Sequence, residues 1–196
     1  MRRRALALAV LGAALVAARP AAAGDRVLRG EVTLEAPVQD VWNAWTTEEG
    51  LRTFFARDAH VDLRVDGLYE IFFDPSAPPG QRGADGMRIL VLEPQRRFAF
   101  TWNAPLDQPE VRKQRTIVTL DFADAGGGRT RLRITHWGWG EGPEWDRAYE
   151  YFDQAWNHAV LPSLEHRFAE GPIDWSNRPE LTPIAPTLKL DLQPRP

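Results

Sequence analysis

Alternation of apolar and polar residues along the chain predicts seven β-strands. In each segment, aliphatic, β-branched or aromatic residues recur at about every second position, which is typical of strands with one buried face. Turn-forming sequences at Asp66-Gly67 and at 124–128 favour antiparallel hairpins. Proline and glycine predict loops at 74–86 and 103–110. The predicted strands are 27–35, 60–65, 68–73, 87–93, 96–102, 115–122 and 129–137.

A different period predicts helices at two places. After Ala36-Pro37, apolar residues at Val38, Val41, Trp42 and Trp45 fall on one helical face. A second short helix is predicted to begin near 47–49. Near the C-terminus, bulky residues recur at steps of three or four, which predicts one long amphipathic helix that Pro162 kinks or divides. These residues are Trp145, Tyr149, Phe152, Trp156, Val160, Leu164 and Phe168.

The order of these elements predicts one α+β domain over residues 24–170. Its antiparallel sheet of about six to seven strands is expected to curl around the long C-terminal helix, with two short helices after the first strand. The remaining segment, 171–196, holds six of the sixteen prolines and is predicted to be an irregular tail. Within this tail, Thr187 to Leu192 alternates and could add an edge strand.

The first 23 residues have the pattern of a signal peptide. Arginines at 2–4 precede an apolar run at 5–18, and small residues at 21–23 provide an A-x-A cleavage site. We therefore expect cleavage near Ala23 and export to the periplasm or the medium. The apolar run is too short for a permanent membrane span, so no stable membrane anchor is expected. An uncleaved anchor and twin-arginine export are the alternatives.

Charge and composition narrow the classes of partner. The chain has 24 basic and 27 acidic residues, a net charge of −3. Loss of the four arginines in residues 1–23 leaves 20 basic residues and a net charge of −7. This acidity argues against a nucleic-acid partner. The chain has no cysteine, which excludes disulfides, thiolate metal sites and cysteine nucleophiles. No histidine spacing indicates a metal site, and no motif indicates a cofactor.

Several short motifs give the chain a family resemblance. They are Ala36-Pro37 with Val41-Trp42, Asp66-Gly67 before 69–71, Leu92-Glu93-Pro94 with 98–102, 128–132 with Thr135-His136, and the aromatic final helix. With these motifs, residues 27–170 resemble the START-like (SRPBCC) helix-grip superfamily, within it the activator of heat-shock-protein ATPase homologue-like group. The resemblance implies a hydrophobic cavity between the curled sheet and the final helix, and no universal catalytic set. The export signal and the tail depart from the group.

Strand parity indicates which side chains could line such a cavity. Arg129, Arg131 and Arg133 share one face of their strand and are expected to face water, so the alternate residues should point inward. Apolar walls with a few polar groups are typical of small-molecule sites, although the same residues could fill an ordinary core. The candidate ligand-binding residues are Tyr69, Ile71, Phe73, Phe98, Phe100, Trp102, Val118, Leu120, Leu132, Ile134, His136, Trp139, Tyr149, Phe152 and Trp156.

The candidate chemistry leaves three functions open. His136 has inward parity, so it could bond a ligand or act as a general base, or it could be a buried structural histidine. The leading hypothesis is a non-enzymatic binder of a hydrophobic or aromatic small molecule. The alternatives are a cyclase- or hydrolase-type enzyme that uses His136 with Tyr69 or Tyr149, and a protein-interaction module. Nothing in the sequence indicates an oligomeric state.

Overall fold

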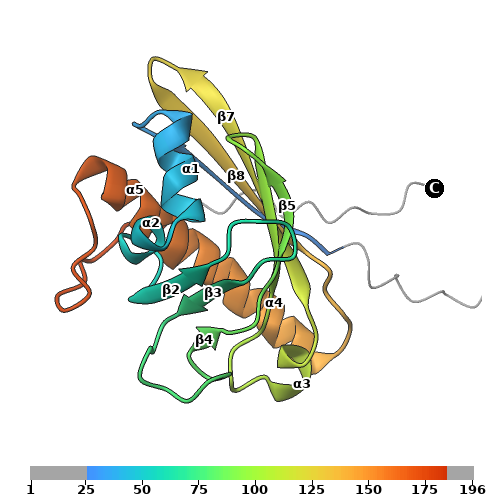
Figure 1. Cartoon of the computed structure of the whole chain (residues 1–196). Coiled ribbons are helices and arrows are strands. Elements are labelled where there is room, and N and C mark those ends of the chain that lie inside the picture. The colour runs from blue at the N-terminus through green and yellow to red at the C-terminus, as the bar shows by residue number, and fades with distance from the viewer. Residues whose placement is uncertain (1–25, 185–196) are drawn as a thin grey trace, which may run out of the picture.

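The computed structural model describes residues 26–184, which form an α+β helix-grip fold (Figure 1). A large antiparallel sheet curves around a long C-terminal helical segment, as the order of the elements predicts. The predicted signal peptide at 1–23 and the predicted edge strand from Thr187 to Leu192 lie outside the described residues.

The large sheet has five strands in the order β1-β8-β7-β6-β5, all antiparallel to their neighbours. Hairpins join β5 to β6 and β7 to β8, and the turn sequence at 124–128 predicted the second of them. The strands are β1 (Leu28–Leu34), β5 (Ile89–Glu93), β6 (Arg97–Trp102), β7 (Thr116–Gly126) and β8 (Arg129–Trp137).

A smaller sheet continues the large one beyond β5. It contains β2 (Asp58–Val61), β3 (Tyr69–Phe72) and the two-residue β4 (Gly83–Ala84), in that order. The backbone N–H of Tyr69 donates to the carbonyl of Met87 over 2.9 Å, which joins the start of β3 to the chain that enters β5. The small sheet is therefore joined to the β5 side of the large one.

The second predicted strand is shorter than the sequence indicates. Strand β2 ends at Val61, whereas the alternation continued to Val65. The N–H of Arg64 donates to the carbonyl of Asp62 over 2.7 Å, and Asp66 has a positive φ of 63°, so 62–67 forms a compact turn. Leu63 and Val65 are exposed as a result. The alternation of apolar and polar residues over 62–65 therefore belongs to a turn and not to a strand.

Helices follow β1 and β8. The two short helices are α1 (Val38–Thr46) and α2 (Glu48–Arg52), where the Thr47 hydroxyl caps α2 by accepting from the N–H of Gly50. A single turn, α3 (Pro109–Arg112), lies in the predicted loop after β6. The long C-terminal segment runs through α4 (Pro143–Ala155), the π-helical turn η1 (Trp156–Val160) and α5 (Leu161–Ala169), and Figure 1 shows it crossing the sheet diagonally.

Pro162 neither ends nor divides this helical segment. The N–H of Leu161 donates to the carbonyl of Trp156, a five-residue step that widens the helix by one residue just before the proline. Proline has no N–H to donate and its ring crowds the carbonyl four residues earlier. The π turn is thus the local form in which the helix accommodates Pro162.

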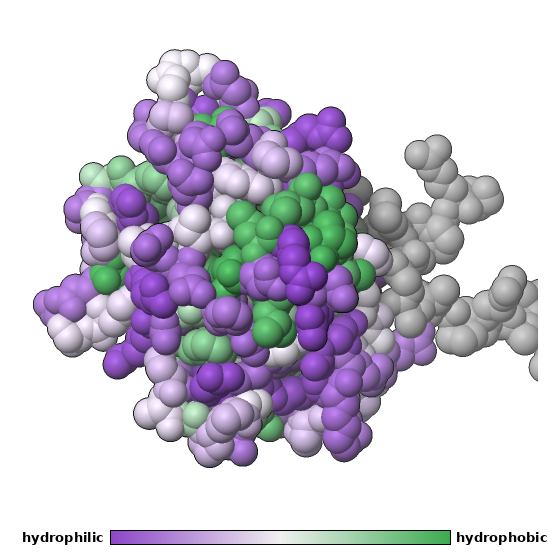
Figure 2. All heavy atoms as spheres, in the orientation of Figure 1, coloured by the Kyte–Doolittle hydropathy of each residue, from purple (hydrophilic) through white to green (hydrophobic). Residues whose placement is uncertain are grey.

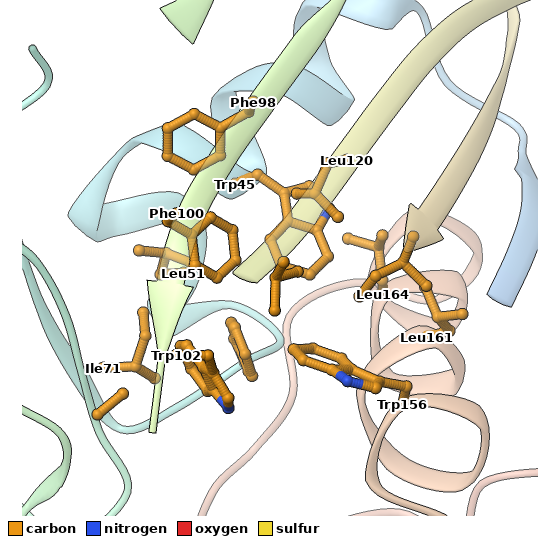
Figure 3. Close-up of a cluster of buried hydrophobic side chains, with 14 of the residues drawn as sticks. Trp45, Leu51, Ile71, Phe98, Phe100, Trp102, Leu120, Trp156, Leu161 and Leu164 are labelled. Atoms are coloured by element: carbon orange, nitrogen blue, oxygen red, sulfur yellow. The ribbon is translucent and has the colours of Figure 1, made fainter. Parts of the chain in front are cut away.

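The core lies between the concave face of the sheet and the helices. Strand parity predicted the inward residues of β6 and β7 correctly, since Phe98, Phe100, Val118 and Leu120 have no exposed surface. Phe98 pairs with Leu120 across β6 and β7, and Phe100 with Val118. Figure 3 shows this cluster from the strand side to the helix side. The labelled members are Trp45, Leu51, Ile71, Phe98, Phe100, Trp102, Leu120, Trp156, Leu161 and Leu164.

One face of the molecule exposes apolar side chains. Figure 2 shows them gathered over β5 and the turn before β3, where Leu63, Val65 and Leu90 are exposed. Strand β5 is an edge of the large sheet, and its pairing with β6 shifts between Ile89 and Val91. Such a bulge interrupts the regular hydrogen-bonding edge and so limits pairing with another strand.

Candidate functional site

A cavity of about 230 Å³ opens at one end of the core. Its walls come from the end of β6 and the segment after it, the connection between β3 and β4, and the helical segment around η1. Aromatic rings form most of the inner surface. The apolar lining residues are Phe55, Phe73, Trp102, Ala104, Pro105, Leu106, Phe152, Ala155, Trp156 and Val160.

Stacked rings give this cavity rigid walls. Phe55 stacks on Trp102 with a centroid distance of 5.8 Å and an interplanar angle of 14°. Trp102 in turn lies 5.9 Å from Trp156, and Figure 3 shows these two indoles on the strand and helix sides of the same cluster. Aromatic contacts at such distances favour fixed ring orientations. The apolar walls of the cavity are therefore in place before any ligand binds.

Arg112 links the backbone segments on the polar side of the cavity by hydrogen bonds. Its guanidinium donates to the carbonyl oxygens of Ala104 over 2.5 Å, Gly80 over 2.8 Å and Gly83 over 2.8 Å. Burial lowers the pKa of Arg112 from its ordinary value, but a guanidinium remains charged at neutral pH. Arg112 thus joins the segment after β6 to the β3–β4 connection.

Asp85 holds the β3–β4 connection from within. Its carboxylate accepts from the N–H groups of Gly80 and Gly83, each over 3.0 Å, and from Arg82 over 2.8 Å. Burial alone would raise the pKa of Asp85, but these hydrogen bonds hold it below its ordinary value. Arg82 also lies 4.0 Å from the centroid of the Phe72 ring. The charges on this side of the cavity are therefore engaged in structural contacts.

Three uncharged polar side chains remain at the lining, namely Gln81, Asn103 and Tyr151. Asn103 is buried and its amide Nδ2 donates to the carbonyl of Gly83 over 3.3 Å, which leaves the amide oxygen as an acceptor. Tyr151 is half-exposed at the mouth, and burial, followed by the charge of Asp107, raises the pKa of its hydroxyl. Tyr151 is therefore protonated at neutral pH and can donate a hydrogen bond.

His136 is a structural histidine rather than the candidate general base. Its Nδ1 accepts from the Trp156 indole N–H over 3.0 Å, and its Nε2 lies 2.7 Å from the Thr116 hydroxyl oxygen. An indole nitrogen can only donate, so the ring proton is on Nε2 and points at Thr116. The side chain has no exposed surface, and burial lowers its pKa well below the ordinary value. Both ring nitrogens are engaged, and His136 does not line the cavity.

The tyrosines that could have acted with His136 also point elsewhere. Tyr69 is completely buried and donates its hydroxyl proton to the carbonyl of Trp45 over 2.8 Å, while burial raises its pKa. Tyr149 donates to the carbonyl of Val27 over 3.3 Å. Neither residue lines the cavity. The proton-handling group predicted for an enzyme is not assembled.

Only part of the predicted ligand-binding set lies at the cavity. Phe73, Trp102, Phe152 and Trp156 line it. The other eleven residues do not line it and pack in the core or at its edge, because the cavity occupies only one end of the sheet. They are Tyr69, Ile71, Phe98, Phe100, Val118, Leu120, Leu132, Ile134, His136, Trp139 and Tyr149.

Phe73 and Trp139 differ from their predicted positions. Strand β3 ends at Phe72, which is buried, so Phe73 leaves the strand's parity and is 49% exposed at the cavity mouth. Trp139 is buried instead, with its indole N–H donating to the carbonyl of His136 over 3.0 Å. Trp139 therefore packs in the core and does not line the cavity.

Sequence reasoning missed Phe55, Asn103 and Arg112. Phe55 follows α2 in a turn, Asn103 begins the predicted loop 103–110, and Arg112 ends the single-turn helix α3 just beyond that loop. The sequence offered only the residue types as a signal. Phe55 is a large aromatic of the kind usually buried, and Asn103 is a polar side chain at the end of a strand.

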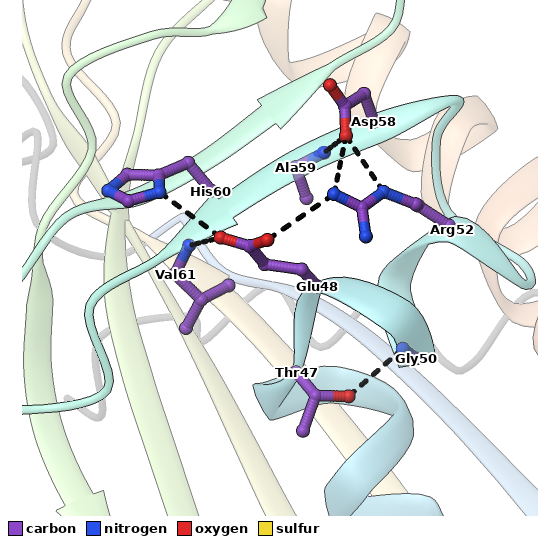
Figure 4. Close-up of polar contacts among 8 residues, drawn as sticks. All are labelled: Thr47, Glu48, Gly50, Arg52, Asp58, Ala59, His60 and Val61. Atoms are coloured by element: carbon purple, nitrogen blue, oxygen red, sulfur yellow. Dashed lines mark hydrogen bonds and ion pairs between the residues drawn. The ribbon is translucent and has the colours of Figure 1, made fainter.

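A polar network fixes the turn that carries Phe55 (Figure 4). Arg52 contacts Asp58 at 2.8 Å and Glu48 at 3.3 Å, and Glu48 accepts from the Val61 N–H and lies 3.1 Å from His60 Nδ1. The bond from Val61, above all, lowers the pKa of Glu48. The network ties α2 to β2 and so holds the turn at 53–57 between them.

Residues 26–184 contain neither a cluster of metal-ligating side chains nor a membrane-spanning helix. No group of three or more histidine, aspartate or glutamate residues there is placed to hold a metal ion. No helix in the same range is long and apolar enough to cross a membrane.

Comparison with known proteins agrees with this geometry. The family model described as Activator of Hsp90 ATPase homolog 1-like protein matches residues 35–169. No curated protein matches the sequence.

Solved structures share the fold at low sequence identity. Protein MLL2253 from Mesorhizobium loti has a TM-score of 0.58 and 23% identity, covering 72% of this chain and 95% of that one. CalU16 from Micromonospora echinospora has a TM-score of 0.54 and 23% identity, covering 76% and 78%. PFC0360w, an HSP90 activator from Plasmodium falciparum, has a TM-score of 0.52 and 20% identity, covering 70% and 94%.

Proposed function

The chain belongs to the Activator of Hsp90 ATPase homolog 1-like family, and from this premise we propose that it binds a hydrophobic or aromatic small molecule without transforming it. The observation that carries the proposal is the cavity of about 230 Å³ with aromatic walls. An apolar cavity of about 150 Å³ is large enough for benzene. The space here suits a molecule somewhat larger than one aromatic ring.

Specificity would come from few polar groups. The Asn103 amide oxygen can accept one hydrogen bond, and the Tyr151 hydroxyl can donate one at the mouth. Pockets of this kind gain affinity from apolar contact and orientation from such isolated groups. A non-catalytic role is supported by the engagement of His136, Asp85 and Arg112 in structural hydrogen bonds. We further propose that this binding takes place after export from the cytoplasm.

A cavity-filling substitution tests the proposal. Ala155 lies on the cavity wall, whereas its neighbour Gln154 is exposed and does not line it. We expect Ala155→Leu to weaken binding of 1-naphthylacetamide at least about tenfold by occupying ligand space, and Gln154→Leu to leave it unchanged. Isothermal titration calorimetry of the full chain measures both, and native mass spectrometry of the purified protein should find a co-purifying apolar molecule. Equal binding by both variants would place the ligand outside this cavity.

A further inference from the structure

A second hollow of about 390 Å³ lies beside the aromatic cavity, on the side of the C-terminal tail. The two spaces adjoin at side chains that line both of them, so the second hollow is within reach of a group carried by a ligand in the first. The residues common to both linings are Phe55, Phe73, Tyr151, Ala155 and Val160.

The tail that follows the family-matched region builds the far wall of this second hollow. The Trp175 indole N–H donates to the carbonyl of Arg52 over 2.7 Å, and the N–H of Ile173 donates to the carbonyl of Thr53 over 2.8 Å. These bonds anchor the tail beside α2. Trp175 and Arg178 consequently line the hollow although they lie beyond residues 35–169.

Two guanidinium groups converge on Trp175. Arg57 donates to the backbone carbonyl of Trp175 over 3.3 Å, and the Arg178 guanidinium carbon lies 5.8 Å from the centroid of the Trp175 ring. Arg178 also donates to the Ser163 hydroxyl oxygen over 3.1 Å. Both arginines line the second hollow, and these hydrogen bonds go to neutral oxygens.

Among the residues that the structure describes, no ion pair neutralises the positive charge of these arginines. Within residues 26–184 neither Arg57 nor Arg178 lies within 4 Å of a carboxylate oxygen, and no acidic side chain lines the second hollow. Hydrogen bonds from Ser76 are the larger cause of the lowered pKa of Asp74, and the charge of Arg57 is a smaller one. The Asp74 carboxylate lines the first cavity and not the second hollow. By contrast, Arg97 on the sheet pairs with Asp121 at 2.7 Å.

We propose that the ligand is an amphiphilic anion, with its apolar body in the aromatic cavity and a carboxylate at Arg57 and Arg178. This inference rests on the proposed function and names the class of ligand for the same site. A guanidinium presents a planar fork of donors that matches a carboxylate. Next to an apolar wall that excludes part of the solvent, two such forks favour an anion over its neutral analogue.

The test compares two probes that differ mainly in charge. 1-Naphthylacetate and 1-naphthylacetamide have the same ring system, and both are titrated into the full chain at about 10 mM salt, where screening is weak. We expect the carboxylate to bind about tenfold more tightly, a difference typical of one charge-assisted hydrogen bond. Arg57→Gln and Arg178→Gln should each reduce this preference, with the amide's affinity unchanged. Arg57→Lys should retain part of it.

A matched control is Arg131→Gln, since Arg131 is exposed on β8 and should leave the preference intact. Equal affinity for the two probes in the parent chain would overturn the inference while leaving the proposed function in place. A carboxylate preference that persists in the double variant Arg57→Gln/Arg178→Gln would overturn it as well, because the anion would then be held elsewhere. Failure of both probes to bind would count against the proposed function itself.

Discussion

At the scale of single residues, the imidazole of His136 is held in one tautomer by its neighbours. The Trp156 N–H occupies Nδ1, and the Nε2 proton points at Thr116, whose hydroxyl lies 3.4 Å from the carbonyl of Trp102. A second proton would have to enter at Nδ1, directly opposite the indole donor. Burial and this opposition act in the same direction, so the folded protein favours the neutral ring.

This environment predicts a specific dependence of stability on pH. Because burial lowers the pKa of His136 well below 6.5, the unfolded chain takes up a proton first as the pH falls. The free energy of unfolding should therefore decline between about pH 7 and about pH 5, by up to about 1.4 kcal/mol per pH unit. Chemical denaturation at several pH values measures this decline. His136→Gln should flatten it, and the control His158→Gln, at an exposed site, should not; an unchanged slope in His136→Gln would contradict the assignment.

At the scale of elements, the π turn explains which predicted helix residues are buried. The sequence period placed Val160 and Leu164 on the buried stripe. Leu164 is fully buried as predicted, but Val160 is only half-buried, whereas Leu161, outside the stripe, is fully buried. The extra residue in η1 moves the buried face forward by one position at this turn. Periodicity therefore predicted the helix and its aromatic first half, and it missed the shift because an α-helical period was assumed throughout.

The crossing of β1 over this helical segment requires a glycine. A Cβ at Gly30 would lie 2.6 Å from Leu161 Cδ1 and 2.8 Å from Ile134 Cγ2, so the strand and the helix touch there. We expect Gly30→Ala to destabilise the protein by about 1–3 kcal/mol through overpacking. Thr33→Ala, on the exposed side of the same strand, should change stability by less than about 0.5 kcal/mol.

A double-mutant cycle identifies the contact that causes this loss. Leu161→Ala alone should cost about 2–5 kcal/mol because it leaves a cavity. The methyl group added by Gly30→Ala would partly occupy that space, so the double variant should be more stable than the sum of the two losses implies. Denaturant unfolding of the four proteins measures the coupling. Strict additivity would show that Gly30 is not constrained by Leu161.

At the scale of the whole molecule, the fold was more predictable than the site. Alternation and helical periods report burial against a sheet or a helix, so they predicted the strands around Phe98 and Leu120 and the helix that carries Trp156. Part of the cavity wall, however, comes from segments with no periodic pattern of apolar residues. Arg112 acts through three backbone carbonyls, and Trp175 acts from a tail that proline marked only as irregular. Contacts of this kind depend on distant parts of the chain, and no local pattern encodes them.

The proposed export is a prediction about the whole chain. Cleavage after Ala23 would leave Gly24 as the first residue, four positions before β1 begins at Leu28. In a Gram-negative host we expect the periplasmic fraction to contain this shortened form, identified by its intact mass and N-terminal sequence. Signal cleavage requires small side chains at the two outer positions of A-x-A, so Ala23→Asp should leave the precursor uncleaved, whereas Ala22→Asp at the middle position should be processed. A full-length chain in the cytosolic fraction, unaffected by Ala23→Asp, would contradict export.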